Sequence, residues 1–585
     1  MKFSKLAELF SQLEGTTKRL EMIDLLANFF KDIKNSGDYS DVDKIVYLLQ
    51  GQLTSNIKQF PKMGLAEKMI IEAISLHSGI NPDKVKQLLL KKGDIGLTAQ
   101  IILTKKKKQK SLLDFHNQTQ VEYESIEISE LYSALLKIAS TEGTGSHDTK
   151  LSILRGLMNR ISPLETKYLL RIITSTLRVG VSTQTIIDGI SLGFTGSKEN
   201  RDIIERAFNL HPDLGYITKL LAEKGLDDVK KVKVEVGIPI RMMLASRVPY
   251  PEIINKLGKP FVAEYKLDGE RLQVHKKDDE VKLFSRRLLD ISEQYPDVCE
   301  NVLKNIKGSK FIVEGEVVAM DPFYEKMLPF QVLSKRRRKY DVESMVKEIP
   351  VCLFLFDLLL YEEEQYIDKP FPERRNKLEE IVNESDAIRL VDSVQINSTE
   401  ELLDYFHKAR EKGNEGIMAK SIQKDSVYQA GNRGFLWIKL KSLEGGKLKD
   451  SIDVVLVGAF YGKGRRTGVF GTYIGAVYDP ENDRFLGFTR IASGWSDEVM
   501  EKLTNDVERL KLSKKDPQVI CEDTPDVWLK PEIVIEIIGD EITKSDKFST
   551  LGYSMRFPVF QRFRPEKGAK DITTVQEIKE LYKTQ

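Results

Sequence analysis

The 585-residue sequence predicts three domains of different secondary structure. We expect an all-helical domain over residues 1–235, a mixed α+β domain over 236–443 and a small β-barrel over 444–585. Three observations support this division. The chain is too long for one hydrophobic core. Apolar residues recur at helical spacing before residue 230. Strand-like segments follow, first mixed with helical stretches and then separated by short turns rich in Gly, Asn and Asp.

In the first domain, Leu20, Ile23, Ala27 and Phe30 fall on one face of a predicted helix. The segment S-P-L-E at 162–165 has the pattern of a capping box with proline at the first helical position, and we expect its helix to end near Gly180. Residues 236–251 contain three prolines and are predicted to form an extended connection.

The second domain is predicted from strand-like segments at 261–266, 271–276, 281–286, 311–320 and 352–360, with helices at 372–384 and 400–412. A further boundary is expected near E-G-G-K at 444–447. The short strands beyond it, followed by a final helix at 573–582, predict a five-stranded oligonucleotide-binding barrel.

Composition bounds the class of protein. The hydrophobic fraction of 41% and the charged fraction of 30% are typical of a soluble globular protein. No apolar stretch approaches the ~20 residues that span a bilayer, and the first residues lack the apolar core of a secretory signal. We therefore expect a cytoplasmic protein with no membrane partner. The three cysteines lie far apart, which argues against a disulfide framework and a zinc ribbon.

Net charge is only +2, but basic residues gather in three clusters, at 105–108, 335–339 and 462–466. Any one of them is equally well explained as a solvated face. Three clusters in one chain favour a polyanionic partner.

The segment K-L-D-G at 266–269 has two interpretations. Asp268-Gly269 is a strong signal for a β-hairpin, because the turn needs residues that tolerate positive φ. Alternatively, Lys266 is a nucleophile. It must then lose its proton, which requires partial burial or nearby positive charge. It also needs cations for phosphates, carboxylates for a magnesium ion and a flat ring for a base.

The sequence supplies these groups after Lys266, in the order Arg271, Arg286, Glu316 in E-G-E, Phe356 in F-D, Glu415 in E-G-I-M-A-K, Arg433 in G-N-R, and Lys439 and Lys441 in W-I-K-L-K. Each group alone has a structural explanation: E-G-E could be a surface hairpin, and W-I-K-L-K a half-exposed strand. Together and in this order they resemble the motif series of the covalent nucleotidyltransferases, which are DNA ligases, RNA ligases and mRNA capping enzymes.

The resemblance covers almost the whole chain and is closest to ATP-dependent DNA ligases of the archaeal replicative type. P-I-R-M-M-L-A-S at 239–246 looks like the start of their catalytic domain, and T-L-R-V-G-V-S at 176–182 resembles their DNA-binding domain. Residues 555–574 look like their C-terminal motif, with Arg556, Arg564 and Asp571 in the expected places. The resemblance implies a DNA-binding domain, an adenylation domain and an OB-fold domain in that order.

The resemblance also implies a three-step reaction. Lys266 attacks the α-phosphorus of ATP and pyrophosphate leaves; AMP then passes to the 5′-phosphate at a DNA nick; finally the 3′-hydroxyl attacks and AMP departs. Such enzymes act in DNA replication, repair and recombination. The implied nucleotide contacts are Glu264, Arg271, Arg286, Glu316, Phe356, Arg433 and Lys439. Asp268, Gly269, Lys441, Arg556 and Arg564 complete the active site, and Glu316 and Glu415 place Mg²⁺, with Mn²⁺ as an alternative.

In this reading Phe356 stacks on adenine and Glu264 faces the nucleotide, through its backbone. Nicked double-stranded DNA is the expected partner, and phosphate contacts and groove shape should dominate its binding. We expect a monomer, associated with the nucleoid in an archaeal cell.

Q-K-S-L-L-D-F-H at 109–116 resembles a sliding-clamp-binding peptide, with Gln109, Leu112 and Phe115 as its contacts. The alternative is an exposed loop that enters a helix at Ser111.

Other functions remain in competition. RNA ligases and capping guanylyltransferases usually lack the long helical N-terminal region. NAD-dependent DNA ligases have a four-cysteine zinc site that this chain cannot build. A non-catalytic nucleic-acid-binding scaffold should have broken motifs, and none is visibly broken. No residue decides between ATP and other nucleotides.

Overall fold

The computed structural model describes residues 1–585 except 56, 58–62, 114–122, 337–341, 442–450, 463–468 and 585; the side chains of 106–113 and 584 are likewise outside the described part. The chain divides into two compact units. One contains residues 1–86 and 95–441, and the other contains 87–94 and 442–585. Within the described residues, no helix is long and apolar enough to cross a membrane.

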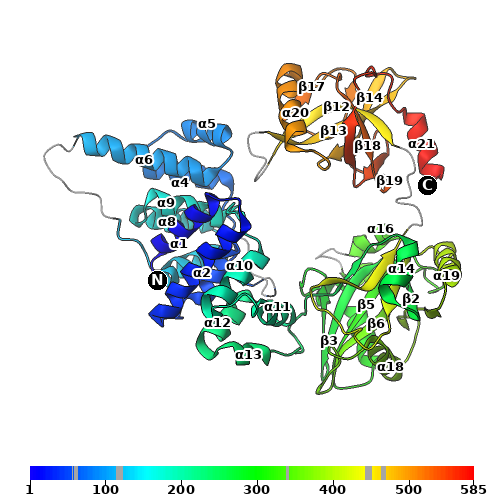
Figure 1. The fold of residues 1–585 in the computed structure, drawn as a ribbon. Helices are drawn as coiled ribbons and strands as arrows, with labels where there is room; N and C mark the ends of the chain where they lie inside the picture. Colours follow the sequence, from blue (N-terminus) through cyan, green and yellow to red (C-terminus); the bar gives the residue numbers. More distant parts are fainter. Residues whose placement is uncertain are drawn as a thin grey trace. The chain divides into compact units, whose positions relative to one another are not determined.

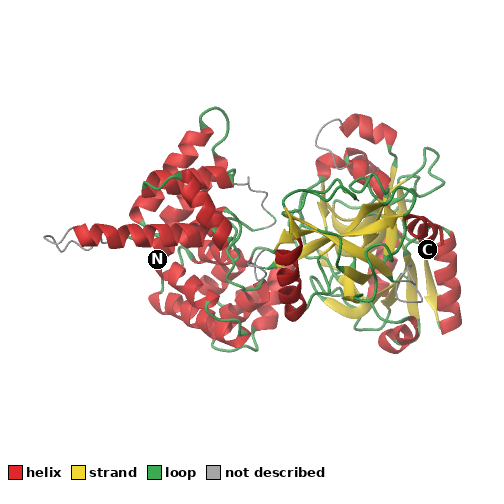
Figure 2. Cartoon of the chain, turned by 90° about the horizontal axis from the view of Figure 1, so that it is seen from above, coloured by secondary structure: helices red, strands yellow, loops and turns green. Residues whose placement is uncertain are grey.

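The first part of the chain is helical, as predicted (Figures 1 and 2). The described residues up to Lys230 contain no named strand. The helices are α1 (Phe3–Glu14), α2 (Arg19–Ser36), α3 (Val42–Leu49), α4 (Glu67–Ser78), α5 (Pro82–Lys92), α6 (Ile95–Leu113), α7 (Ile128–Ser140), α8 (Ser146–Arg160), α9 (Pro163–Ile173), α10 (Thr183–Ile190), α11 (Arg201–Leu210), α12 (Leu214–Lys224) and α13 (Leu226–Lys230), with a π-helical turn at Ser191–Thr195.

The predicted buried face of α2 is correct for Ile23, Ala27 and Phe30 and wrong for Leu20, whose exposed fraction is 66%. Leu20 lies in the first turn, and the buried face begins at Met22. The helical spacing of the apolar residues was therefore predicted correctly, but the first residue of α2 that packs against the core was not.

The predicted capping box at the start of α9 is confirmed. Ser162 Oγ accepts a hydrogen bond from Glu165 N at 3.2 Å, and Glu165 Oε2 accepts one from Ser162 N at 2.8 Å. The helix ends at Ile173, well before the predicted end near Gly180. Ser175 has a φ of 53°, and this left-handed conformation takes the chain out of the helix.

Two β-sheets form the central part of the first unit. One has the strand order β1-β11-β10-β2-β9, and the other has the order β4-β3-β5-β6-β7, with β8 also paired to β6. The first sheet contains β1 (Leu244–Ser246), β2 (Phe261–Lys266), β9 (Ser393–Ile396), β10 (Gly416–Ser421) and β11 (Arg433–Leu440). The second contains β3 (Glu270–Lys277), β4 (Glu280–Ser285), β5 (Lys310–Ala319), β6 (Val351–Tyr361), β7 (Glu364–Gln365) and β8 (Ile388–Leu390).

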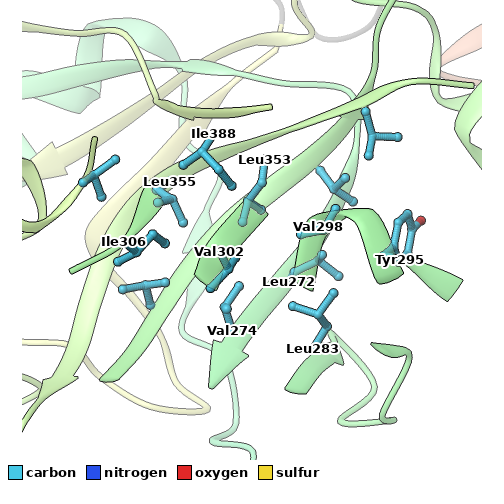
Figure 3. Close-up of a cluster of buried hydrophobic side chains, with 14 of the residues drawn as sticks. Leu272, Val274, Leu283, Tyr295, Val298, Val302, Ile306, Leu353, Leu355 and Ile388 are labelled. Carbon is cyan, nitrogen blue, oxygen red and sulfur yellow. The ribbon is translucent and has the colours of Figure 1, made fainter. Parts of the chain in front are cut away.

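The helices of this part are α14 (Tyr250–Leu257), α15 (Pro296–Asn305), α16 (Phe330–Leu333), α17 (Val342–Glu348), α18 (Phe371–Ile381) and α19 (Thr399–Glu411). The last two confirm the helices predicted at 372–384 and 400–412. Leu272, Val274, Val298, Val302 and Leu353 form a buried cluster between the second sheet and α15 (Figure 3). A further cluster contains Leu267, Ile312, Val318, Phe356 and Trp437, which come from both sheets and the turn between them.

K-L-D-G does not form a β-hairpin. β2 pairs with β10 and β9, whereas β3 pairs with β4 and β5, so the turn carries the chain from one sheet to the other. A Cβ on Gly269 would lie 2.3 Å from Val317 O, so glycine is required where the turn crosses β5. Lys266, the last residue of β2, is placed at the junction of the two sheets.

E-G-E is not a surface hairpin either. Glu314, Gly315 and Glu316 lie in the middle of β5, a strand paired on both sides, and Glu314 is fully buried. β5 runs from Lys310 to Ala319 and confirms the strand predicted at 311–320.

The basic cluster at 105–108 lies in α6. The clusters at 335–339 and 462–466 fall largely outside the described residues. Within the former, Arg336 is fully buried and pairs with Asp297 at 2.6 Å. This arginine therefore belongs to the interior of the domain and is not available to a polyanion.

The second unit confirms the predicted OB-type domain. Its main sheet has eight strands, not five, because the short strands β15, β16 and β17 pair along it. The strands are β12 (Ile452–Tyr461), β13 (Phe470–Asp479), β14 (Arg484–Ile491), β15 (Lys511–Leu512), β16 (Val519–Ile520), β17 (Val527–Leu529), β18 (Val534–Ile538) and β21 (Val559–Phe563); β19 (Glu541–Lys544) pairs with β20 (Tyr553–Arg556). Helices α20 (Asp497–Leu510) and α21 (Val575–Thr584) complete it, and α21 is the predicted final helix.

Candidate active site

A cleft of about 400 Å³ opens beside the junction of the two central sheets. It brings together residues that the sequence spreads from 264 to 441. The predicted site residues that line it are Glu264, Lys266, Gly269, Arg271, Arg286, Glu316, Phe356, Glu415, Arg433, Lys439 and Lys441. The cleft walls are therefore formed by both sheets.

Lys266 is held at the edge of the cleft by an ion pair. Its Nζ lies 2.7 Å from Glu415 Oε2, and Lys441 Nζ lies 2.7 Å from the same oxygen. Burial acts to raise the pKa of Glu415, but the two lysines outweigh it and hold this pKa at about 2. Glu415 is therefore ionised at neutral pH and is available to a cation or an amine.

Glu316 and Asp268 are the other carboxyl groups near Lys266. Burial raises the pKa of Glu316 to about 7, against the opposing charges of Lys266 and Arg271. Burial also raises the pKa of Asp268, whose Oδ2 accepts a hydrogen bond from Phe330 N at 3.2 Å. The described residues contain no cluster of three or more His, Cys, Asp or Glu that could hold a metal ion alone. A Mg²⁺ ion still fits Glu316 and Glu415, because Mg²⁺ is usually bound by one or two carboxylates together with water and phosphate.

Positive charge also gathers in the lining of the cleft. Burial lowers the pKa of Lys439, and the charges of Lys441, Arg433, Lys266 and Arg286 lower it further. These cations are close enough to repel one another, so an anion that enters among them is stabilised. Such an arrangement suits a triphosphate.

Arg271 is fixed by protein groups. It pairs with Glu314 at 2.7 Å and donates a hydrogen bond to Met243 O at 2.8 Å. Its guanidinium lies 5.3 Å from the ring centroids of Phe356 and Trp437. Among the described residues its Nε has no hydrogen-bond partner, which leaves one donor for a ligand.

Phe356 lies in the middle of β6, which agrees with the strand predicted at 352–360. The next residue, Asp357, is fully buried, and its charge is matched by Arg374 at 2.7 Å. Phe356 lines the cleft, and its ring meets Trp437 edge-on at a centroid distance of 6.0 Å.

Lys420 is a site residue to which the sequence analysis assigned no role, although it ends E-G-I-M-A-K. It lines the cleft and pairs with Glu264 at 2.6 Å. The side chain of Glu264 is thus held by Lys420. The expected contact between its backbone and the nucleotide stays a prediction. No local signal marks this pair, because the two residues lie on neighbouring strands far apart in sequence.

The remaining predicted residues belong to other parts of the chain. Arg556 and Arg564 belong to the second unit, where Arg556 pairs with Glu541 at 2.9 Å and Arg564 pairs with Asp453 at 2.9 Å. Gln109 and Leu112 lie in α6, but their side chains are outside the described residues, and so is the whole of Phe115.

A cleft lined by a lysine, carboxylates, further cations and an aromatic ring has the groups that covalent nucleotidyl transfer requires. The structure therefore defines a nucleotidyltransferase site. Comparisons with known proteins identify the family within this class.

Three family models match the chain: DNA ligase N terminus over 2–191, ATP dependent DNA ligase domain over 242–441 and ATP dependent DNA ligase C terminal region over 466–567. A DNA ligase of Sulfurisphaera tokodaii is 44% identical over 100% of this chain and 98% of its own length, and one of Sulfolobus acidocaldarius matches at the same identity and coverage. A solved chain named Pmar-Lig_PreS3 covers 96% of this chain and 99% of its own with a TM-score of 0.57, and at 18% identity it shows the fold alone.

The chain belongs to the ATP-dependent DNA ligase family. It is an enzyme that uses ATP, and its substrate is nicked DNA, which it seals. Family membership decides against the RNA ligase, capping enzyme and scaffold interpretations. The three-domain prediction of a helical domain, an adenylation domain and an OB-type domain is also confirmed.

Proposed function

We propose that this ligase seals nicks through AMP bound covalently to Lys266. The observation that carries the proposal is the position of Lys266 at the sheet junction, on the cleft and 2.7 Å from Glu415. In the first step Lys266 Nζ forms a bond to the α-phosphorus of ATP as the bond to pyrophosphate breaks. The lysine must be unprotonated to attack, so its contact with Glu415 is broken or loosened before the reaction.

The cations of the cleft hold the phosphates in this proposal. Arg286, Arg433, Lys439 and Lys441 offset the charge that develops on the oxygens, and Arg271 Nε donates to the ribose. Phe356 stacks on the adenine. When bound, a divalent cation, Mg²⁺ with Mn²⁺ as an alternative, supplies further neutralisation of phosphate charge. Glu316 and Glu415 are the residues that would hold it.

We assign Arg556 and Arg564 to the first step as well, where they orient the departing pyrophosphate. This role requires the OB-type domain to close on the cleft and then to withdraw so that DNA can bind. The proposed boundaries for this movement are a DNA-binding domain at 1–235, an adenylation domain at 236–443 and an OB-fold domain at 444–585. Asp268 and Gly269 hold the turn that carries Lys266.

The proposed setting is the replication, repair and recombination of DNA inside the cell, with the ligase acting as a monomer near the nucleoid. We also propose that Gln109, Leu112 and Phe115 bind a sliding clamp. The test is the double variant Leu112→Ala/Phe115→Ala. It should lose binding to the clamp and retain nick sealing in the absence of the clamp; retained clamp binding would rule the peptide out.

The experiment that tests the covalent mechanism uses ATP, GTP or NAD labelled in the transferable nucleotide, with Mg²⁺ and a denaturing gel. ATP should label the protein, and nicked DNA should remove the label more effectively than nicked RNA. Labelling by GTP alone would contradict adenylation. A lack of label in protein freed of bound AMP would contradict a covalent intermediate.

A further inference from the structure

Asp453 is a nearly buried carboxylate of the second unit that holds two cations of the C-terminal motif at 555–574. It lies in β12, and its exposed fraction is 8%. Arg564 Nη1 donates a hydrogen bond to Asp453 Oδ1 at 2.9 Å, and Lys567 Nζ lies 2.6 Å from Asp453 Oδ2. Lys567 N also donates to Arg564 O at 3.1 Å. A single turn of the chain thus places both cations on one carboxylate.

The main chain fixes the position of Asp453. Its N donates a hydrogen bond to Thr573 Oγ1 at 3.1 Å, and its O accepts one from Thr573 N at 3.2 Å. The segment from Arg564 to Thr573 therefore contacts the same residue of β12 at both of its ends. Because the carboxylate is attached to a paired strand, it determines where the two cations lie.

A carboxylate at this position destabilises the sheet on its own. Asp453 lies directly opposite Glu536 of β18, and like charges in that register are unfavourable. Arg562 of β21 pairs with Glu536, whereas Arg564 and Lys567 offset the charge of Asp453. An apolar residue would serve the strand better, because a nearly buried charge is costly unless it is paired. The charge of Asp453 therefore indicates a role toward the two cations.

The two cations have further capacity to bind an anion. A guanidinium carries five N–H donors and an ammonium carries three. Arg564 uses Nη1 for Asp453 and Nε for Glu566, at 2.6 Å, and Lys567 uses one donor for Asp453. Asp453 occupies only part of this capacity. Two cations held side by side suit an anion with several phosphate oxygens, such as pyrophosphate.

We propose that Asp453 is a positioning residue for the departing pyrophosphate. It holds Arg564 and Lys567 in place before pyrophosphate is contacted, so that less conformational entropy is lost when the two cations bind. The inference rests on the proposed role of Arg564 in the first step, and it extends that role to Lys567. Asp453 touches no part of the nucleotide and acts only through the two cations.

The first step, run in reverse, isolates the contact with pyrophosphate. Full-length enzyme that carries AMP is mixed with Mg²⁺ and inorganic pyrophosphate. An oxygen of pyrophosphate forms a bond to the phosphorus of AMP as the bond to Lys266 Nζ breaks, and ATP is released. Asp453→Asn retains the shape of the side chain and removes its charge. We expect the half-saturating concentration of pyrophosphate to rise by about tenfold or more, as for the loss of a charged hydrogen bond.

Sealing of a nick that already carries AMP is the second readout, because pyrophosphate takes no part in that step. Asp453→Asn should seal this nick at the wild-type rate. A merely structural role would damage the domain as a whole, so slowing of both reactions by the same factor would overturn the inference. Asp483→Asn is the matched control, because Asp483 holds Lys570 of the same C-terminal motif at 2.6 Å. Its pyrophosphate dependence should equal that of the wild type.

A double-mutant cycle tests whether Asp453 acts through Arg564. Arg564→Ala should itself raise the half-saturating concentration of pyrophosphate. Adding Asp453→Asn to this variant should have a smaller effect than it has in the wild type, because only Lys567 is then left to be released. Fully additive effects would overturn the inference, since Asp453 would then act by another route.

The failure of the inference and the failure of the proposed function give different results. Wild-type pyrophosphate dependence in Asp453→Asn alone would overturn the inference and leave the role of Arg564 intact. Wild-type dependence in Arg564→Ala would remove Arg564 from the first step and overturn both. If Asp453→Asn does not fold, Asp453→Ser also removes the charge and should give the same shift.

Discussion

Lys266 Nζ and Lys441 Nζ both lie 2.7 Å from one oxygen of Glu415. The carboxylate thus joins the proposed nucleophile to a cation of the phosphate-binding wall. It is also a proposed ligand of the divalent cation. In this proposal Glu415 releases the amine of Lys266 and binds the divalent cation when the nucleotide enters the cleft.

Replacing Glu415 by glutamine tests this double role. A neutral amide binds a hard divalent cation more weakly than a carboxylate does and has no net charge to attract the lysines, so Glu415→Gln should slow formation of the covalent adenylate by roughly a hundredfold. Single-turnover labelling with ATP measures the rate. Glu411→Gln, a change of an exposed glutamate at the end of α19, is the control. Wild-type labelling by Glu415→Gln would remove Glu415 from the mechanism.

Gly269→Ala should disrupt the turn between the sheets. The added Cβ would lie 2.3 Å from Val317 O and 2.8 Å from Glu316 Cγ, so the turn or β5 must shift. We expect a loss of stability of about 1–3 kcal/mol and slower adenylation. Gly156→Ala is the control, because its Cβ would meet nothing within 4 Å. Denaturant unfolding measures the stability of each variant relative to the wild type. If Gly269→Ala were as stable as the wild type, the turn would have room for a side chain.

The buried His275 should make the central part of the chain sensitive to acid. Burial lowers its pKa to about 3, and Lys282 contributes. Its Nδ1 accepts a hydrogen bond from Gly237 N at 3.0 Å, which requires a neutral ring. The folded pKa of His275 is depressed below the ordinary value of about 6.5. The contribution of the neutral ring to the free energy of unfolding is therefore fully present above pH 6.5. As the pH falls toward 3, this contribution is lost at ~1.4 kcal/mol per pH unit.

The variant His275→Gln lacks the hydrogen bond from Gly237 N to His275 Nδ1 and should therefore be less stable than the wild type at pH 7. The difference in free energy of unfolding between the two proteins should narrow by pH 5. Hydrogen exchange of the β3 amides, corrected for intrinsic rates, measures it. A difference that grows with acid would mean that His275 is charged in the folded protein.

Binding to nicked DNA should depend strongly on salt. A nick offers little sequence to read, so phosphate contacts dominate and counterions are released on binding. For about 6–10 phosphate contacts, affinity should fall roughly 10³-fold or more between 50 and 200 mM salt. Titration of labelled nicked duplex at several salt concentrations gives the slope. Affinity that is equal at low and moderate salt would contradict this description of the interface.

Local patterns predicted the helical half of the fold well and the turn at Asp268-Gly269 poorly. A capping box such as Ser162 and Glu165 is decided within four residues, so its pattern is visible in the sequence. Strand pairing is not local. The hairpin signal was sound as a turn signal, but the partner of Lys266 across the sheet is Gly416 and not a residue of the next strand.

The same limit applies to the candidate site. The order of charged and aromatic residues predicted which side chains line the cleft, because their types match the chemistry. It did not predict the pairs that orient them. Arg271 with Glu314 and Glu264 with Lys420 are ion pairs between strands, and their formation depends on the sheet registers.

The central claim is that Lys266 carries AMP, and peptide mapping after labelling tests it most directly. The wild-type enzyme, first freed of bound AMP with pyrophosphate, is incubated with labelled ATP and Mg²⁺, digested and sequenced by mass spectrometry. We predict AMP on Lys266 alone, no label in Lys266→Ala, and full labelling of Lys277→Ala, which alters an exposed lysine of β3. Labelling that persists in a folded Lys266→Ala variant, or AMP mapped to another lysine, would contradict the account.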